Sequence, residues 1–459
     1  MMVVHDAPPD APPLTRTMSE PSNLLGPARK HLVPLLLFVG ALLWYLHRLQ
    51  EPRTYMYDEA YHAFTAAEYL TGNPDAFLWS TPAPRPGVGY TWNHPPLGLL
   101  LISAGILSLG DTSRGWRLFS ALFGALGIAV AYSLAVTLSR DREVGLLTAA
   151  LILVDGLYFV QSRTAMLDVF GTVFVMGALL CFHGYLVAPH ERVRRTLMGT
   201  GLWLGMAVAT KWNAAFPATL IGLVTAVRTL ELRRRSRTGA GFPEAQARAG
   251  LRQHLLWVPL ALLAVPTMVY LLAYVPFFLV GHDWSQFVEL QAQIFRYHTG
   301  LKATHDYQSS WWQWPLALRP VWYHVHYSTA AITNVYAQGN PLLYWAFLPA
   351  VAWLAWHWWR DRHPGLTILL IGFFGQWLPW ALVARAAFMY HFLPAVPFGA
   401  LAVASAVVAL WRGSLLYRVL AAAYVLAVAS AFLYFHPLHA AVPLRPEALN
   451  SRMWLEGWR

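Results

Sequence analysis

The chain has 459 residues, of which 57% are hydrophobic and only 12% are charged, and its mean hydropathy is +0.42. A soluble domain carries roughly a quarter charged residues, so this composition excludes a soluble globular protein and indicates a polytopic membrane protein. The formal net charge is +11, but the arginines lie in short segments between apolar runs, which is typical of membrane orientation and argues against nucleic-acid binding. A single cysteine, Cys181, excludes an internal disulfide and a metal site built on cysteines.

The chain begins with a polar segment and continues as a series of apolar runs. Residues 1–30 are rich in proline and polar residues, and we expect them to be disordered and cytoplasmic. We expect a transmembrane catalytic domain over 31–435 and an outer tail over 436–459. The predicted spans have about the length that crosses a bilayer: 31–49, 114–138, 144–160, 166–188, 196–210, 213–230, 255–280, 341–358, 366–384, 390–411 and 416–435.

A further apolar run, 96–109, is short for a span and follows His94 and two prolines. If it lies in the membrane interface and the N-terminus is cytoplasmic, the basic segments all fall on the cytoplasmic side: 139–143, 189–195, 231–237, 360–363 and 411–418. A crossing by 96–109 would place them outside, against the positive-inside rule. We therefore predict an interfacial helix at 96–109 and two long outer loops, 50–113 and 281–340.

Asp58 and Glu59 are adjacent in the first outer loop, in the stretch TYMYDEAYHAF. Adjacent carboxylates beside a membrane are costly unless they face water or take part in chemistry. Neighbours on a helix point in different directions and cannot share one proton, so we expect one general base and one supporting group. Two alternatives stay open: Asp58 and His62 share a helix face and could ligate a divalent ion, or the pair is a solvated helix start.

Further polar residues fall on the same outer side. His94 in TWNHPPLG is aimed by the two prolines that follow it. Arg163 and Asp168 lie in QSRTAMLD, and Lys211 lies in ATKWNAAF. Arg163 suits a phosphate at the membrane surface, because a guanidinium binds phosphate well. Structural explanations also fit: Arg163 and Asp168 could pair across a short turn, and Lys211 could snorkel beside Trp212.

The second outer loop contains the aromatic stretch SSWWQWPLALRPVWYHVHY, residues 309–327. Aromatic faces bind sugars and lipid chains, so the stretch indicates an acceptor or glycolipid surface, with Trp314 and Arg319 as members. His391 lies on the same outer side, and we assign it to this surface. A plain interfacial anchor is the alternative.

Several motifs occur in an order that resembles the protein O-mannosyltransferase family. They are the Asp-Glu pair, HPPLG, RLFSALFGAL, SRTAMLD, KW, WPLALRP, GNPLLYW and YHFLPAVPF, spread over residues 54–398. The resemblance implies an all-α polytopic glycosyltransferase of the GT-C fold with about eleven transmembrane helices. The implied reaction is an inverting transfer of mannose from a polyprenyl phosphate to Ser or Thr hydroxyls of a secreted polypeptide.

The resemblance also implies roles for individual residues. Asp58 looks like the catalytic base and Glu59 like its supporting partner, and Arg163 looks like an essential basic residue near the donor phosphate. Together with that arginine, the expected donor-binding set contains Lys211, His94 and Asp168. No cofactor is implied, and a divalent metal is not expected.

The chain also departs from the family pattern. The Lys that commonly follows HPPLG is Leu99, and the acidic residue usual two positions before the His is Trp92. Both departures concern donor contacts of the first loop. Loop 281–340 is too short for the β-trefoil MIR domain of eukaryotic members, which indicates a bacterial-type enzyme of the plasma membrane, acting on the outer face.

Two other functions compete with protein mannosylation. One is a GT-C transfer of another lipid-linked sugar, such as aminoarabinose, to a lipid; the other is a lipid-linked sugar flippase or transporter. A transporter would carry charges near the membrane midplane, whereas Asp155 is the exception among the acids considered in lying inside a predicted span. The expected partners are the lipid-linked sugar, a secreted polypeptide met at the translocon, and membrane lipid.

Overall fold

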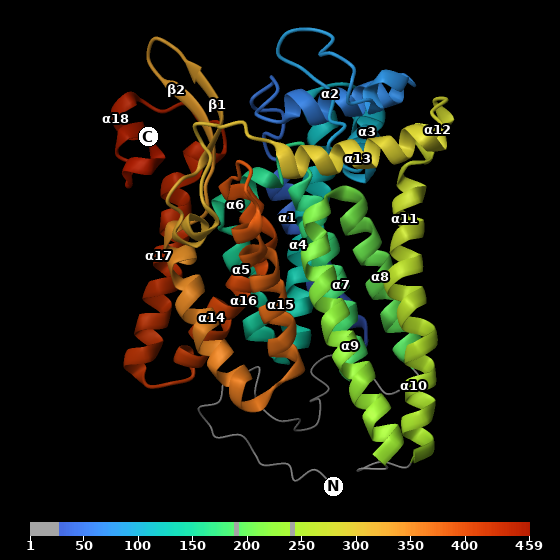
Figure 1. Cartoon of the computed structure of the whole chain (residues 1–459). Coiled ribbons are helices and arrows are strands. Elements are labelled where there is room, and N and C mark those ends of the chain that lie inside the picture. Colours follow the sequence, from blue (N-terminus) through green and yellow to red (C-terminus); the bar gives the residue numbers. More distant parts are fainter. Residues whose placement is uncertain (1–26, 188–191, 239–243) are drawn as a thin grey trace.

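The structure is a computed structural model that describes residues 27–187, 192–238 and 244–459, so most of the segment expected to be disordered lies outside the described residues. Long helices run side by side and form a bundle (Figure 1). They are α1 (Pro27–Leu46), α4 (Ser113–Ser139), α5 (Arg142–Leu153), α7 (Asp168–Val187), α8 (Val193–Thr210), α9 (Ala215–Thr238), α10 (Glu244–Pro259), α11 (Val265–Ala273), α14 (Pro341–Asp361), α15 (Pro364–Trp377), α16 (Val396–Trp411) and α17 (Leu415–His439).

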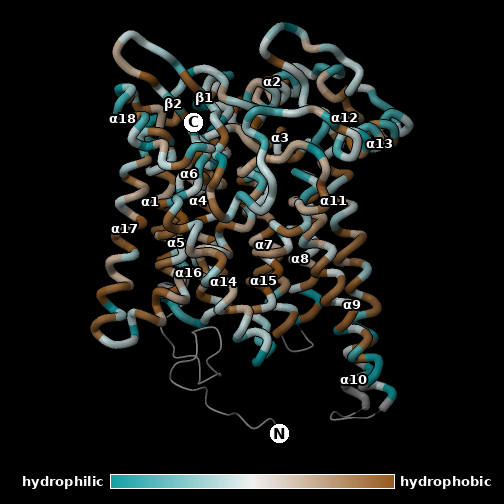
Figure 2. The backbone as a smooth tube through the Cα atoms, turned by 60° about the vertical axis from the view of Figure 1, so that its left-hand side comes forward, coloured by the Kyte–Doolittle hydropathy of each residue, from teal (hydrophilic) through white to brown (hydrophobic). Residues whose placement is uncertain are grey.

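Among the described residues, 7 helical segments are long and apolar enough to cross a membrane. They cover the predicted spans that begin at 114, 166, 213, 255, 366, 390 and 416. The other predicted spans correspond to α1, α5 with the short helix after it, α8 and α14. Figure 2 shows apolar residues along the helices and hydrophilic residues at their ends. The chain is therefore a multi-pass membrane protein, and the count of eleven crossings stays a prediction.

One end of the bundle, the upper end in Figure 1, carries the long connections. It holds α2 (Glu59–Leu70), α3 (Leu97–Leu109), α12 (Val275–Leu279), α13 (Trp284–Gly300) and the strands β1 (Val321–Tyr327) and β2 (Ile332–Ala337). The start of α4 touches the segment that follows α1, because the Ser113 hydroxyl donates to the Gln50 carbonyl at 3.0 Å. Segment 50–113 thus leaves and re-enters the bundle at one end, and α3 does not carry the chain to the other end.

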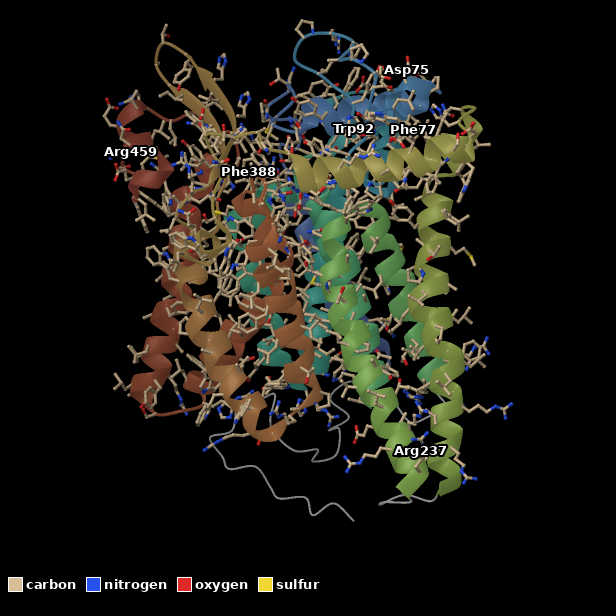
Figure 3. The ribbon with its side chains drawn as sticks, viewed as in Figure 1. Asp75, Phe77, Trp92, Arg237, Phe388 and Arg459 are labelled. Carbon is tan, nitrogen blue, oxygen red and sulfur yellow. The ribbon has the colours of Figure 1, made fainter. Side chains whose placement is uncertain are left out.

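The predicted basic segments meet at the opposite end. Arg412, before α17, pairs with Asp141 at 2.6 Å and also with Glu143, at the start of α5. Arg237, at the end of α9, lies at the lower end in Figure 3. This arrangement has the parity that the basic segments predicted.

The structure corrects the expected architecture in two places. The chain is not all-α, because β1 and β2 form an antiparallel two-stranded sheet inside the outer loop 281–340. The predicted span 144–160 is not one helix: it divides into α5 and α6 (Gly156–Gln161) at Val154 and Asp155. Asp155 caps α6 by accepting a hydrogen bond from the Tyr158 N–H at 2.8 Å, which gives this buried acid a structural partner.

The short helix α6 packs closely on α4, and glycine makes this approach possible. A Cβ atom at Gly124 would lie 2.3 Å from the Ser162 hydroxyl, and one at Gly127 would lie 2.0 Å from the Tyr158 hydroxyl. Tyr158 in turn donates to the Gly124 carbonyl at 3.0 Å. The segment 161–168, which the sequence singled out, is held at the upper end of the bundle by this contact.

Candidate active site

A cavity of about 570 Å³ opens at the upper end of the bundle. Its walls come from segments far apart in the sequence. They are 57–62 at the start of α2, 90–94 before α3, 297–305 at the end of α13, 385–391 before α16, and the single residues Met166 and Lys211. Trp92 and Phe388, from two of these walls, both lie at the upper end in Figure 3. The predicted outer loops thus enclose one space.

Asp58 presents a free carboxyl to this cavity. It is the N-cap of α2, but its side chain makes no capping hydrogen bond. Its carbonyl oxygen instead accepts the Tyr61 and His62 N–H groups at 2.9 and 2.8 Å. Burial raises the pKa of Asp58 to about 7; the charge of Lys211 opposes this rise and that of Asp168 adds to it. A carboxylate with a pKa near the working pH suits a general base.

Glu59 points the other way, into the protein. Its side chain is 0% exposed and forms a two-pronged ion pair with Arg117, with Nε–Oε1 and Nη2–Oε2 distances of 2.7 Å. The same carboxylate accepts the backbone N–H groups of Met56 and Ala165 at 2.9 Å each. Both oxygens are therefore occupied, and Glu59 does not line the cavity. Its contacts fix the residue beside it, as expected of a supporting partner, and exclude it as a second proton-transfer group.

Arg117 was missed as a site residue, although it lies in the RLFSALFGAL motif. Besides Glu59 it donates to the carbonyls of Leu49, Pro52 and Thr54, at 3.2, 2.7 and 3.1 Å. It therefore ties the start of α4 to the chain that leads to Asp58. A charged residue inside a predicted span was the signal that could have found it.

Lys211 and Asp168 pair with each other. The Lys211 ammonium lies 2.8 and 3.0 Å from the two carboxylate oxygens of Asp168, whose side chain is fully buried. Lys211 lines the cavity and Asp168 stands behind it. The expected Arg163–Asp168 pair across the turn was therefore wrong. Asp168 orients the lysine and is not a direct donor contact.

Three histidines with lowered pKa values line the same cavity. Burial, with the charge of Lys211, lowers the pKa of His62 to about 3 and that of His94 well below its usual range. Burial also lowers the pKa of His298, to about 4. Their rings form a row, with 6.3 Å between the centroids of His62 and His94 and 5.3 Å between those of His94 and His298. Near pH 7 these rings are neutral and can donate hydrogen bonds without adding charge.

The structure does not bring Arg163 to the cavity. Its guanidinium donates to the Arg48 carbonyl at 2.7 Å and lies 4.8 Å from the Phe159 ring centroid. Burial, with Arg117 and Arg48 nearby, lowers its pKa to about 10. The predicted contact with the donor phosphate is withdrawn, because the arginine is engaged with the end of α1.

The predicted acceptor surface does not exist as one surface. Trp314 is 1% exposed and donates to the Ser309 hydroxyl at 3.0 Å, so it is a core residue. Arg319 donates to the Asp306 carbonyl at 2.6 and 3.1 Å, away from the cavity. His391 is also buried, but it lines the cavity beside Tyr390. Of this set, only His391 belongs to the site.

The metal alternative finds no cluster to support it. In the described parts of the chain, no group of three or more His, Cys, Asp or Glu side chains could hold a metal ion. His62, the alternative partner of Asp58, has its Nδ1 atom 3.2 Å from the Ala165 carbonyl.

Two family models match nearly the whole described chain. Residues 35–280 match dolichyl-phosphate-mannose-protein mannosyltransferase, and residues 283–458 match the C-terminal four-helix membrane region of protein-O-mannosyltransferase. The chain belongs to the protein O-mannosyltransferase family. A polyprenol-phosphate-mannose–protein mannosyltransferase of Mycobacterium tuberculosis is 27% identical over 90% of this chain and 88% of that relative.

Solved structures of this and a related enzyme have the same fold. The Saccharomyces cerevisiae protein O-mannosyltransferase Pmt1-Pmt2 complex, bound to the sugar donor, covers 97% of this mannosyltransferase with a TM-score of 0.76 at 16% identity, and 94% of the yeast chain is covered. ArnT of Cupriavidus metallidurans, bound to undecaprenyl phosphate, covers 87% with a TM-score of 0.55 at 21% identity, and 70% of that chain is covered. The likeness supports the predicted GT-C fold.

Proposed function

We propose that this protein mannosyltransferase uses Asp58 as the general base that activates a Ser or Thr hydroxyl of its protein acceptor. Family membership gives the reaction class: mannose moves from a polyprenol-phosphate carrier to a protein. The observation that carries the role of Asp58 is its free carboxyl, which shares one cavity with Lys211. A base and a cation on one cavity are what the transfer of a phosphate-linked sugar needs.

The reaction can be followed atom by atom. The Asp58 carboxylate takes the proton of the acceptor hydroxyl as the hydroxyl oxygen bonds to the anomeric carbon of mannose. The bond from that carbon to the phosphate oxygen breaks, and its electron pair leaves with the polyprenol phosphate. Attack and departure occur on opposite faces of the sugar, so one base suffices, the configuration inverts and no covalent sugar–enzyme intermediate forms.

The departing phosphate needs positive charge and hydrogen-bond donors. Lys211 and Arg385 line the cavity and supply the charge, and neutral His94 and His298 supply N–H groups. The His94 Nδ1 atom has no partner among the described side chains and backbone, although it is buried. An unpartnered buried donor is costly, and a phosphate oxygen would satisfy it. Lys211, held by Asp168, thus replaces Arg163 as the main proposed phosphate contact.

The cavity end of the bundle is proposed to face the outside of a bacterial plasma membrane, with the N-terminus cytoplasmic. The basic segments at the opposite end support this orientation by the positive-inside rule. A lipid-linked sugar would enter from the membrane, and a secreted polypeptide, met at the translocon, would supply the hydroxyl from the outer aqueous side.

A transfer assay tests the proposed function directly. Purified protein in lipid vesicles is incubated with radiolabelled polyprenol-phosphate-mannose and a Ser/Thr-rich peptide. We expect label on the peptide, with inverted anomeric configuration, and none on a matched peptide whose Ser and Thr residues are replaced by Ala. Label that reaches only lipid, or no product, would contradict the proposal.

The cavity arginine gives a prediction for donor binding. Arg385→Gln should raise the dissociation constant for polyprenol phosphate by about tenfold or more, since a charge-assisted hydrogen bond contributes about 1.5–3 kcal/mol. Arg319→Gln is the matched control, because Arg319 lies outside the cavity and should change binding less than twofold. Equal losses in the two variants would contradict the assignment. Binding to the purified variants is measured with radiolabelled lipid.

A further inference from the structure

The hairpin of β1 and β2 contains an irregularity next to the candidate active site. Val321 and Trp322 pair with Ala337 and Tyr336, but the next pair is His324 with Val335. Tyr323 is therefore an extra residue without a partner on β2, a β-bulge. Bulges free the backbone groups of the extra residue and redirect its side chain, often beside active sites.

The freed residue holds the neighbour of the proposed base. The Tyr323 carbonyl accepts the Tyr57 N–H at 3.1 Å. The two phenol rings stack, with 4.6 Å between centroids and 4° between planes. Tyr57 has a φ of +48°, which bulky residues adopt rarely and at a cost of about 1–3 kcal/mol. Contacts around the residue must hold this conformation, and those with Tyr323 involve both its backbone and its ring.

Tyr323 is itself supported from behind. Its hydroxyl accepts a hydrogen bond from the Gln161 side chain at 2.7 Å, at the end of α6. The start of α6 is fixed by Asp155, whose other oxygen accepts the Asn340 N–H at 2.9 Å, just after β2. One support thus joins the hairpin to α6 at both ends, and it accounts for the buried Asp155.

On its other side the Tyr57 ring reaches the cationic wall of the cavity. Its centroid lies 5.9 Å from that of Tyr390 and 6.3 Å from that of Phe388, with both pairs edge to face. The Lys211 ammonium lies 5.4 Å from the Tyr390 centroid. The rings from Tyr323 to Tyr390 therefore set the spacing between Asp58 and Lys211.

We propose that Tyr323 is a positioning residue for Asp58: the bulge, braced by Gln161, holds Tyr57 in its left-handed conformation and so aims the neighbouring carboxylate at the acceptor. This inference rests on the proposed function, in which Asp58 is the base. It gives the hairpin a catalytic purpose separate from acceptor or lipid binding.

A comparison of two tyrosines on the same strand tests the inference. Tyr323→Leu should lower kcat of mannose transfer by about 10–100-fold, because small misplacements of a reacting group have effects of this size. The donor KM should stay within about twofold, since the phosphate contacts remain. Tyr327→Leu is the control: Tyr327 is 65% exposed on the same strand, and its replacement should leave kcat unchanged. Equal kcat values for the two variants would overturn the inference.

The pH profile separates positioning from a loss of folded enzyme. The wild-type rate should rise with pH through the pKa of Asp58, about 7. A displaced Asp58 that gains water has a lower pKa, so the rising limb of Tyr323→Leu should shift to lower pH. The groups that face Asp58 across the cavity keep their positions in this variant: Lys211, Arg385, His62, His94, His298, His305 and His391. A lower rate with an unshifted limb would overturn the inference.

A gentler pair of variants keeps the test usable if Tyr323→Leu fails to fold. Tyr323→Phe and Gln161→Met each remove only the hydroxyl–amide bond. We expect similar losses in kcat, about two- to fivefold, with no further loss in the double variant, because both remove one interaction. Additive losses, or none, would overturn the inference. In the same assay, full activity of Asp58→Asn would refute the proposed function itself, so the two failures remain distinguishable.

Discussion

Asp58→Asn should abolish mannose transfer while leaving donor binding intact. An amide cannot accept the hydroxyl proton, and general base catalysis contributes about 10²–10⁴-fold to such steps. The contacts proposed for the phosphate come from Lys211 and Arg385, which this change leaves in place. The measurements are the initial rate of peptide mannosylation and the equilibrium binding of polyprenol phosphate.

Asp75→Asn is the matched control for this experiment. Asp75 is an exposed aspartate at the same end of the bundle, outside the cavity (Figure 3). It should transfer mannose at the wild-type rate. Full turnover by Asp58→Asn would remove the base assignment, and loss of donor binding would mean that Asp58 acts on the phosphate side of the site.

Glu59→Gln should fail in a different way, although its residue is adjacent to Asp58. The change leaves the buried Arg117 charge unpaired, and breaking a buried ion pair costs about 3–5 kcal/mol of folding stability. We expect a marked fall in the apparent melting temperature of the detergent-solubilised protein, together with loss of transfer. Asp58→Asn should melt no lower than wild type, because a carboxyl whose pKa is raised in the folded state destabilises that state when it ionises.

The contrast between the two acids is the decisive result. A Glu59→Gln protein with wild-type melting behaviour would show that the pair with Arg117 carries little stability. A stable but inactive Glu59→Gln protein that still binds donor would give Glu59 a direct part in proton transfer, against the contacts of its two oxygens.

The membrane topology and the position of the site could be predicted from sequence, because both depend on patterns along the chain. Span lengths and basic segments are one-dimensional signals, and they located Asp58, His94 and Lys211 correctly at one end. Partner choice could not be predicted in the same way. Asp168 pairs with Lys211, 43 positions away, and not with nearby Arg163, because helix packing sets which buried charges meet.

The elements that were mispredicted share a physical cause. The VWYHVHY stretch has the β-branched and aromatic residues of a strand, but it was interpreted as an interfacial aromatic surface. The break at Asp155 needs the backbone N–H of Asn340, a tertiary contact that no local pattern indicates. Trp314 was assigned to the surface because its burial depends on packing against Trp380 and His391 from another segment.

The uncharged imidazoles bear on how each catalytic cycle ends. The donor is a phosphodiester with one negative charge, whereas the spent carrier is a monoester with about 1.5 to 2 negative charges near neutral pH. A recess full of imidazolium groups would retain the spent carrier more firmly than the incoming one. Rings that stay neutral at His62, His94 and His298 can orient both lipids equally. The enzyme thereby escapes inhibition by its own exhausted carrier.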